Sequence, residues 1–105
     1  MVLYHAPMKG QPEVTPHCVH VLISGRVQGV CFRMATCEEA ERRGLKGWVK
    51  NLSTGQVEAL FEGPESEVLA MLNWCHQGPP GAVVKEVQVT IEPCQGAYQD
   101  FRITR

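Results

Sequence analysis

The sequence predicts one α/β domain of the α+β sandwich type, in which two helices pack on one face of an antiparallel sheet in the order βαββαβ. Three observations indicate this class. Several short segments show period-two apolar alternation, two segments between them show helical spacing, and glycine or proline stands at most of the boundaries. A chain of 105 residues is long enough to form one hydrophobic core without disulfides or metal.

The first strand is predicted to begin at Cys18. Its odd-numbered residues, from Val19 to Ile23, are apolar and share one face, and its other face is partly apolar, so we expect both faces to be at least partly covered. Residues 1–17 carry three prolines and scattered polar residues. We expect them to form a flexible N-terminal arm outside the domain formed by residues 18–105.

The first helix is predicted over residues 33–44, with Gly44 as its stop. Met34, Cys37 and Ala40 recur at helical spacing and are expected to form its buried stripe. Two acidic residues each precede an arginine by four positions, which is the favourable order for helical ion pairs. These pairs are expected on the solvent face: Glu38 with Arg42, and Glu39 with Arg43.

The same signals place four further strands or helices after the first helix, and a short one at the end. They are strands at 45–51 and 56–62, a helix at 63–78, a strand at 82–92 and a small extra strand within 100–105. Gly55 can supply the positive φ of a hairpin turn between the first two of these strands. The second helix has its apolar residues at helical spacing: Val68, Met71, Leu72 and Cys75.

The order of helices and strands predicts the topology of the sheet. Two helices that fall between strands in this order suit a split βαβ arrangement with both helices on one face. The right-handed crossover rule makes the first and second strands parallel and leaves a gap that the third strand can fill. The predicted strand order is therefore 4-1-3-2.

Composition excludes some partners and compartments. Ten basic and eleven acidic residues give a net charge of −1, and no basic block is present, so we expect no nucleic-acid partner. The five cysteines have no CxxC or metal-ligand spacing and are expected to be reduced thiols. No stretch has the length of a membrane span or of a secretory h-region. We therefore expect a cytoplasmic protein with no membrane partner.

The segment GRVQGVCFR, residues 25–33, runs from the end of the first strand into the first helix. Its amides and the unpaired N–H groups of the first helical turn converge on one place, which favours an anion. Gly25 and Gly29 permit tight backbone conformations, and Arg33 adds a charge with a geometry suited to phosphate. The sequence thus predicts a phosphate-binding loop, with a tight turn and a solvent-facing Arg33 as the alternative.

The segment matches neither common phosphate signature, since both G-x-x-x-x-G-K-[ST] and GxGxxG are absent, and it implies no nucleotide. The segment CEEAERR, residues 37–43, has the C-x5-R spacing of a cysteine phosphatase. Its three carboxylates would repel phosphate, it lacks glycine, and it lies within the predicted helix. We interpret that match as chance.

Asn51 is predicted to lie opposite the loop. It ends the second strand, and parallel strands bring their C-terminal ends to the same edge of a sheet, here with one strand between them. The two ends would be roughly 10 Å apart at a strand spacing of ~4.8 Å, which leaves space for a phosphate and a water. An amide can both donate to and accept from that water. A turn-forming asparagine is the alternative interpretation.

Taken together, GRVQGVCFR, GWVKN and GQVEALFEG resemble the acylphosphatase family. The family pattern has glycine, valine, glutamine, glycine and valine in a loop that ends in Phe-Arg, then Gly-Trp-Val-x-Asn, then Gly-x-Val-Glu. The resemblance extends over residues 18–105 and includes the closing Phe-x-Ile at Phe101 to Ile103. It implies a ferredoxin-like fold and hydrolysis of the carboxyl-phosphate bond of acyl phosphates, without metal or cofactor.

The resemblance also implies roles for individual residues. Arg33 would bind the phosphoryl group together with the amides of the loop, and Asn51 would position the attacking water. The predicted substrate-binding residues are those that close the loop: Gly29, Val30, Cys31, Phe32 and Arg33. The partners we expect are a small-molecule acyl phosphate and inorganic phosphate as product, and we expect the protein to be a monomer.

Several alternatives remain open at this point. The chain could be a non-catalytic phosphate-binding module like the acylphosphatase-like start of a larger carbamoyl-transfer protein. RNA-binding domains and soft-metal carriers share the predicted fold, but residues 56–62 lack basic and aromatic alternation and the first loop lacks paired cysteines. A metal at His17, Cys18 and His20 is disfavoured because alternation places His17 on the opposite face of the strand.

Overall fold

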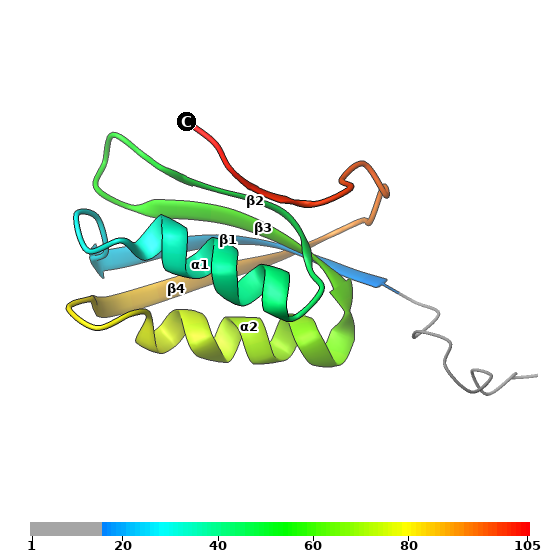
Figure 1. Cartoon of the computed structure of the whole chain (residues 1–105), viewed down its shortest axis with the longest axis horizontal. Coiled ribbons are helices and arrows are strands. Elements are labelled where there is room, and N and C mark those ends of the chain that lie inside the picture. The colour runs from blue at the N-terminus through cyan, green and yellow to red at the C-terminus, as the bar shows by residue number, and fades with distance from the viewer. Residues whose placement is uncertain (1–15) are drawn as a thin grey trace, which may run out of the picture.

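The computed structural model describes residues 16–105, and Figure 1 shows their arrangement. The helices and strands are β1 (Pro16–Arg26), α1 (Phe32–Arg42), β2 (Lys46–Asn51), β3 (Val57–Pro64), α2 (Glu65–Gln77), β4 (Val83–Glu92) and β5 (Phe101–Ile103). The predicted order βαββαβ with a small terminal strand is confirmed. Strand β1 begins two residues before the predicted start, and the rest of the predicted arm, residues 1–15, lies outside the described residues.

The sheet has the order β4-β1-β3-β2-β5. Strand β3 pairs antiparallel with both β1 and β2, so β1 and β2 run parallel to each other with β3 between them, as predicted. Strand β4 pairs antiparallel with β1. Strand β5 pairs parallel with β2 and makes the five-stranded sheet mixed, although the four strands of the predicted order are antiparallel to their neighbours.

Both helices lie on one face of the sheet, as Figure 1 shows. The core between the layers contains apolar side chains from β1, β3 and α2, because alternate strand residues and one helical stripe point inward. Val21, Ile23, Phe61 and Met71 are fully buried there. This is the ferredoxin-like sandwich that the sequence predicted. In the part of the chain that the structure describes, no helix has the length and apolar character needed to cross a membrane.

Helix α1 begins at Phe32, one residue earlier than predicted, and buries a different stripe. Phe32, Thr36 and Ala40 are its buried residues, whereas Met34 is 57% exposed. Successive helical residues are about 100° apart, so Met34 stands about 200° from Phe32, on the opposite face of the helix. The prediction that Met34 belongs to the buried stripe was wrong.

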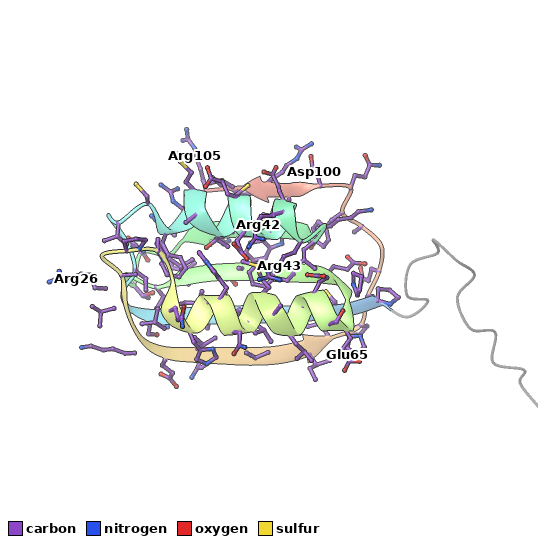
Figure 2. All side chains as sticks on the ribbon, turned by 60° about the horizontal axis from the view of Figure 1, so that its bottom comes forward. Arg26, Arg42, Arg43, Glu65, Asp100 and Arg105 are labelled. Carbon is purple, nitrogen blue, oxygen red and sulfur yellow. The ribbon has the colours of Figure 1, made fainter. Side chains whose placement is uncertain are left out.

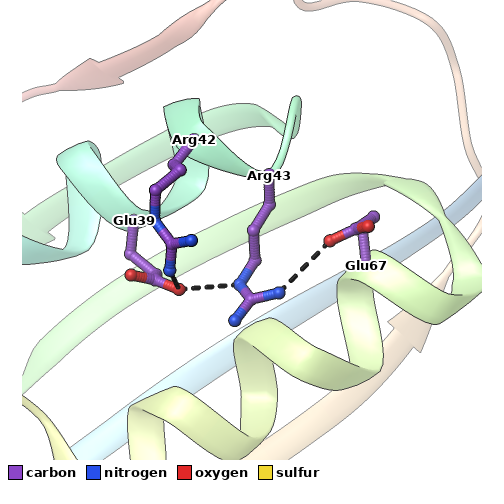
Figure 3. A network of polar contacts seen from close by, with 4 residues as sticks. All are labelled: Glu39, Arg42, Arg43 and Glu67. Carbon is purple, nitrogen blue, oxygen red and sulfur yellow. Dashed lines mark hydrogen bonds and ion pairs between the residues drawn. The ribbon is translucent and has the colours of Figure 1, made fainter.

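Of the two ion pairs predicted for α1, Glu39 with Arg43 forms and Glu38 with Arg42 does not. Glu39 accepts hydrogen bonds from both Arg42 and Arg43, and Arg43 reaches across to Glu67 of α2 at 3.3 Å, as Figure 3 shows. Glu38 has no ion pair within residues 16–105. The Glu39 side chain is only 11% exposed. The Glu39–Arg43 pair therefore faces α2 rather than solvent.

The connection between β4 and β5, residues 93–100, crosses the face of the sheet that the helices leave open; we call it the crossing segment. It has to cross because β4 and β5 form opposite edges of the sheet. The indole N–H of Trp48 donates to the Tyr98 hydroxyl at 3.3 Å, and the Gly47 amide donates to the Asp100 carbonyl at 2.9 Å. These contacts hold the segment against β2.

Candidate active site

A cavity of about 380 Å³ lies where the loop after β1, the start of α1 and the end of β2 meet. Arg33 and Asn51, the two residues predicted to carry the chemistry, both line it. The predicted binding residues Gly29, Cys31 and Phe32 line it as well. The parallel orientation of β1 and β2 brings these segments together, since both strands end at the same edge of the sheet.

The backbone of the loop has two residues with positive φ close to the cavity. Gly29 has a φ of 77°, and a Cβ built on it would meet nothing within 4 Å. Cys31 has a φ of 61° although it carries a side chain, which costs about 1–2 kcal/mol. Structures retain such strain when surrounding contacts impose it, and functional sites commonly do so. The backbone of residues 29–31 is thus held in a conformation that leaves the cavity open.

Gly25 has a structural role in the sheet and not the predicted role in the phosphate-binding loop. Its φ is 131°, and a Cβ there would lie 2.1 Å from the Val83 carbonyl oxygen of β4. The register between β1 and β4 shifts between Ser24 and Gly25. Gly25 is therefore required for the close approach of two strands, and it does not line the cavity.

The start of α1 offers unpaired donors to the cavity. Its N-cap residue, Cys31, makes no side-chain capping bond, and the first turn contains no acidic residue. The first amides of a helix have no partner within the helix, and the helix dipole adds partial positive charge at that end. An anion is the natural partner for these groups.

Arg33 supplies the formal positive charge of the site. No carboxylate of residues 16–105 lies within ion-pair distance of its guanidinium. Arg26, the other arginine of this region, is exposed and projects away from the body of the domain, as Figure 2 shows. A guanidinium without a protein partner at a cavity that also receives helix amides can bind a phosphoryl group through two parallel hydrogen bonds.

Asn51 presents an unsatisfied acceptor. It is the last residue of β2, and its Oδ1 atom is buried without a hydrogen-bond partner among the described residues. A buried carbonyl oxygen without a partner is costly and calls for a ligand or a water. Asn51 is also one of the residues that line the cavity.

Gln28 joins the two halves of the site, and the sequence reasoning missed it. Its side-chain amide donates to the carbonyl oxygens of Leu52 and Gln56, both at 2.8 Å. Leu52 follows Asn51 directly, and its own amide also donates to the Gln56 carbonyl. The turn that follows Asn51 is therefore hydrogen-bonded to the loop after β1. The signal in the sequence was a polar residue between the apolar Val27 and Val30.

The remaining residues of the loop and its surroundings differ in whether they line the cavity or pack in the core. Val30 packs against the core instead of lining the cavity, so it can contribute only its backbone amide. Phe32 is buried and meets Trp74 edge to face at 5.7 Å, which fixes the start of α1. Gln28 and three apolar residues complete the lining and were not predicted as site residues: Val27, Met34 and Ile103.

The alternatives considered from the sequence find no matching geometry. Cys37 donates a hydrogen bond to the Phe101 carbonyl, while Arg43 faces Glu39 and Glu67, so the C-x5-R spacing does not build a site. His20 binds Glu58 at 2.5 Å. Within residues 16–105, no cluster of three or more histidine, cysteine or acidic side chains could hold a metal ion.

The lining also lacks an ionisable base, because it contains no histidine, aspartate or glutamate. What the site offers is a positive charge, unpaired backbone donors and an amide. Such a set can bind and orient a phosphorylated compound and a water, which defines a phosphate-binding α+β protein.

Comparison with known proteins agrees with this class. The acylphosphatase family model matches residues 19–103. An acylphosphatase of Rubrobacter xylanophilus is 52% identical over 85 residues, which cover 81% of this chain and 77% of the relative. The structure of an acylphosphatase from Coxiella burnetii superposes with a TM-score of 0.84 at 40% identity, covering 90% of this chain and 99% of that one. The chain belongs to the acylphosphatase family and is an acylphosphatase, a hydrolase.

A larger protein also contains a similar unit. The crystal structure of full-length HypF in a phosphate- and nucleotide-bound form superposes with a TM-score of 0.79 at 33% identity. The match covers 87% of this chain but only 12% of that protein. The fold thus also serves as a module within a larger chain.

Proposed function

We propose that Arg33 and the amides of residues 29–33 bind the phosphoryl group of an acyl phosphate while Asn51 orients the attacking water. One observation carries the proposal. One cavity is lined by both Arg33 and Asn51, which follow the ends of two parallel strands. Within residues 16–105, Arg33 has no carboxylate partner and the side-chain oxygen of Asn51 has no hydrogen-bond partner. Phosphate and water are the ligands that these two groups lack.

The reaction needs little more than this positioning. A carboxylate is a good leaving group and departs without a general acid, so binding and electrostatic stabilisation can account for catalysis. Water attacks phosphorus, the bond from phosphorus to the acyl oxygen breaks, and the carboxylate leaves. Because the lining holds no carboxylate or imidazole, a phosphoryl oxygen of the substrate accepts the water's proton. The products are a carboxylate and inorganic phosphate.

The proposal requires no metal and no cofactor, and it assigns no nucleic-acid or membrane partner. It also treats the chain as a monomer that acts in the cytoplasm, because the cavity is built from the elements of one domain. Light scattering on the purified protein measures the oligomeric state directly.

The test of the proposal is Asn51→Ala. Removing one preorganised polar group should lower kcat for benzoyl phosphate by roughly 10²-fold, while inorganic phosphate should still inhibit competitively with little change in Ki. Asn73→Ala is the matched control, since Asn73 is exposed on α2 and outside the cavity. Near-normal turnover in Asn51→Ala would remove Asn51 from the mechanism, and phosphate binding without any turnover in the parent would indicate a binding module.

A further inference from the structure

Two cysteines meet where the crossing segment leaves β4. The thiol of Cys94 donates a hydrogen bond to the Pro16 carbonyl oxygen at 3.4 Å. Pro16 and Cys18 are alternate residues of β1, and Glu92 is the residue paired with Cys18 across the ladder. Cys94 follows Glu92 by two positions, so its sulfur lies against β1 beside Cys18. Each of the two cysteines lies near enough to shift the pKa of the other.

We propose that Cys18 and Cys94 are a thiol pair that closes to a reversible disulfide and fastens the crossing segment to β1. All five cysteines are free in the structure, which shows the reduced state of this pair. The bond would fix the point at which residues 93–100 begin to cross the open face of the sheet. Trp48 and Gly47 already hold the other end of that segment.

The geometry requires only a small movement. A disulfide needs the two sulfurs about 2.05 Å apart and the Cβ atoms about 3.5–4.5 Å apart. Cys18 is fixed in the middle of a sheet and is 4% exposed. Cys94 lies beyond Glu92, the last paired residue of β4, where the backbone makes no ladder hydrogen bonds. Cys94 is therefore the cysteine that can move toward the other.

The reaction balances with a small disulfide oxidant such as oxidised glutathione. The thiolate of Cys94, the more exposed of the two, attacks one glutathione sulfur and releases one glutathione thiolate. Cys18 then loses its proton and attacks the Cys94 sulfur of the mixed disulfide, which releases the second glutathione. Two protein thiols are oxidised and one glutathione disulfide is reduced to two thiols, which take up the two protons that the cysteines lose.

Burial and the surrounding charges determine how fast the disulfide between Cys18 and Cys94 forms. Burial raises the pKa of Cys18 to about 11, with Cys94 and the carboxylates of Glu62 and Glu92 adding to the shift. Burial and the charge of Glu62 also raise the pKa of Cys94. Tyr98 of the crossing segment is the other titratable group beside Cys18. Because the thiolate is the nucleophile, closure should be slow at neutral pH and faster under alkaline conditions. Burial disfavours both thiolates and outweighs the opposing effect of Cys18 on the pKa of Cys94, so the closed disulfide should resist reduction.

The experiment exposes the full chain to excess oxidised glutathione at pH 7 and pH 9 and follows its mass over time. We expect a product 2 Da lighter than the reduced chain, formed faster at pH 9, whose non-reducing peptide map links the peptides of Cys18 and Cys94. Its thermal midpoint should rise by about 5 °C or more, because the bond closes a long loop of the unfolded chain. Dithiothreitol should return the midpoint to its starting value.

Two variants provide the controls. Cys94→Ser should form no such product and show no rise in the midpoint, whereas Cys37→Ser, which alters a half-buried thiol elsewhere, should behave like the parent chain. A stable glutathione adduct on Cys94 without closure would overturn the proposal. So would a peptide map that links any other pair, or an equal rise of the midpoint in oxidised Cys94→Ser.

Discussion

At the scale of single residues, the site depends on groups whose partners are missing. Arg33 has no carboxylate partner in the described part of the chain, although Glu39, Glu58 and Asp100 each bind a basic side chain. An arginine left without a partner at a cavity costs the fold little, because its charge remains partly solvated, and it remains free for a ligand. The planar guanidinium then matters as much as its charge.

Arg33→Lys tests this point, since lysine keeps the charge and loses the planar fork. The Ki for inorganic phosphate should rise about tenfold, and kcat for benzoyl phosphate should fall by at least the same factor. Arg26→Lys is the matched control, because Arg26 is exposed and outside the cavity lining. If Arg33→Lys binds phosphate as tightly as the parent, Arg33 faces solvent and the loop is an ordinary turn.

Gln28 acts through other residues and is a positioning residue. Gln28→Ala removes two hydrogen bonds from the turn next to Asn51, which should cost roughly 1–2 kcal/mol of unfolding free energy. At temperatures far below the thermal midpoint, kcat should still fall severalfold, because Asn51 is no longer held in register with the loop. Steady-state kinetics and thermal unfolding of the same preparation separate the two effects, with the exposed Gln88→Ala as control. An unchanged kcat would show that the link is purely structural.

At the scale of helices and strands, period and turn signals predicted the order, and pairing explains what they missed. The crossover rule predicted that β3 lies between β1 and β2, and therefore that Arg33 and Asn51 lie at the same edge of the sheet. Periodicity alone could not show that α1 starts at Phe32, because Cys31 in a left-handed conformation sets that start. Nor could it show that Ile91, opposite Val19, is exposed, since this depends on β4 being an edge strand.

The contact between α1 and α2 predicts a dependence of stability on acid. The hydrogen bond from Arg42, together with the charges of Arg42 and Arg43, lowers the pKa of Glu39 from 4.5. A lowered folded pKa means that this stabilisation is present above about pH 4.5 and is lost as the pH falls through the folded value. Glu39→Gln should therefore lower the unfolding free energy by roughly 1 kcal/mol at pH 7 and by less at pH 3.

Glu38→Gln is the control for that measurement, because Glu38 is exposed on the same helix and has no ion pair within residues 16–105. Urea unfolding of the three proteins at both pH values gives the comparison. If Glu38→Gln loses as much stability as Glu39→Gln at pH 7, the pairing of Glu39 with Arg42 and Arg43 in Figure 3 contributes nothing beyond general helix electrostatics.

At the scale of the whole molecule, helices cover one face of the sheet, the crossing segment passes over one end of the other face, and the site lies at one end of the sandwich. The meeting of Arg33 and Asn51 at one cavity was predictable because it follows from strand direction alone. Gln28 and Ile103 were not, because their contributions depend on side-chain reach and on the position of β5 beside β2. A site built at the meeting of four segments should be lost when the core that holds them loosens.

The core itself contains a titratable group that makes its stability depend on alkali. Cys75 is fully buried on α2, and burial, aided by the charge of Glu39, raises its pKa from 9.0 to about 12. Below pH 9 the thiol is protonated in both the folded and the unfolded chain, so its contribution is fully present. Between pH 9 and about 12 only the unfolded chain releases the proton, and the unfolding free energy should fall by up to about 1.4 kcal/mol per pH unit.

This effect is isolated by comparing how steeply the unfolding free energy falls with pH, instead of comparing unfolding free energies at one pH. Cys75→Ala should lower the unfolding free energy at pH 7 by opening a small cavity, yet should lose less with each further pH unit above 9 than the parent. Val68→Ala opens a comparable cavity on the same buried stripe of α2 without removing a titratable group, so it should keep the parent's slope. Cys18 stays in all three proteins, and its raised pKa leaves a residual slope common to them. Denaturant unfolding at pH 8, 9, 10 and 11 measures the slopes, and equal slopes in Cys75→Ala and Val68→Ala would show that Cys75 does not govern the alkaline limit of the fold.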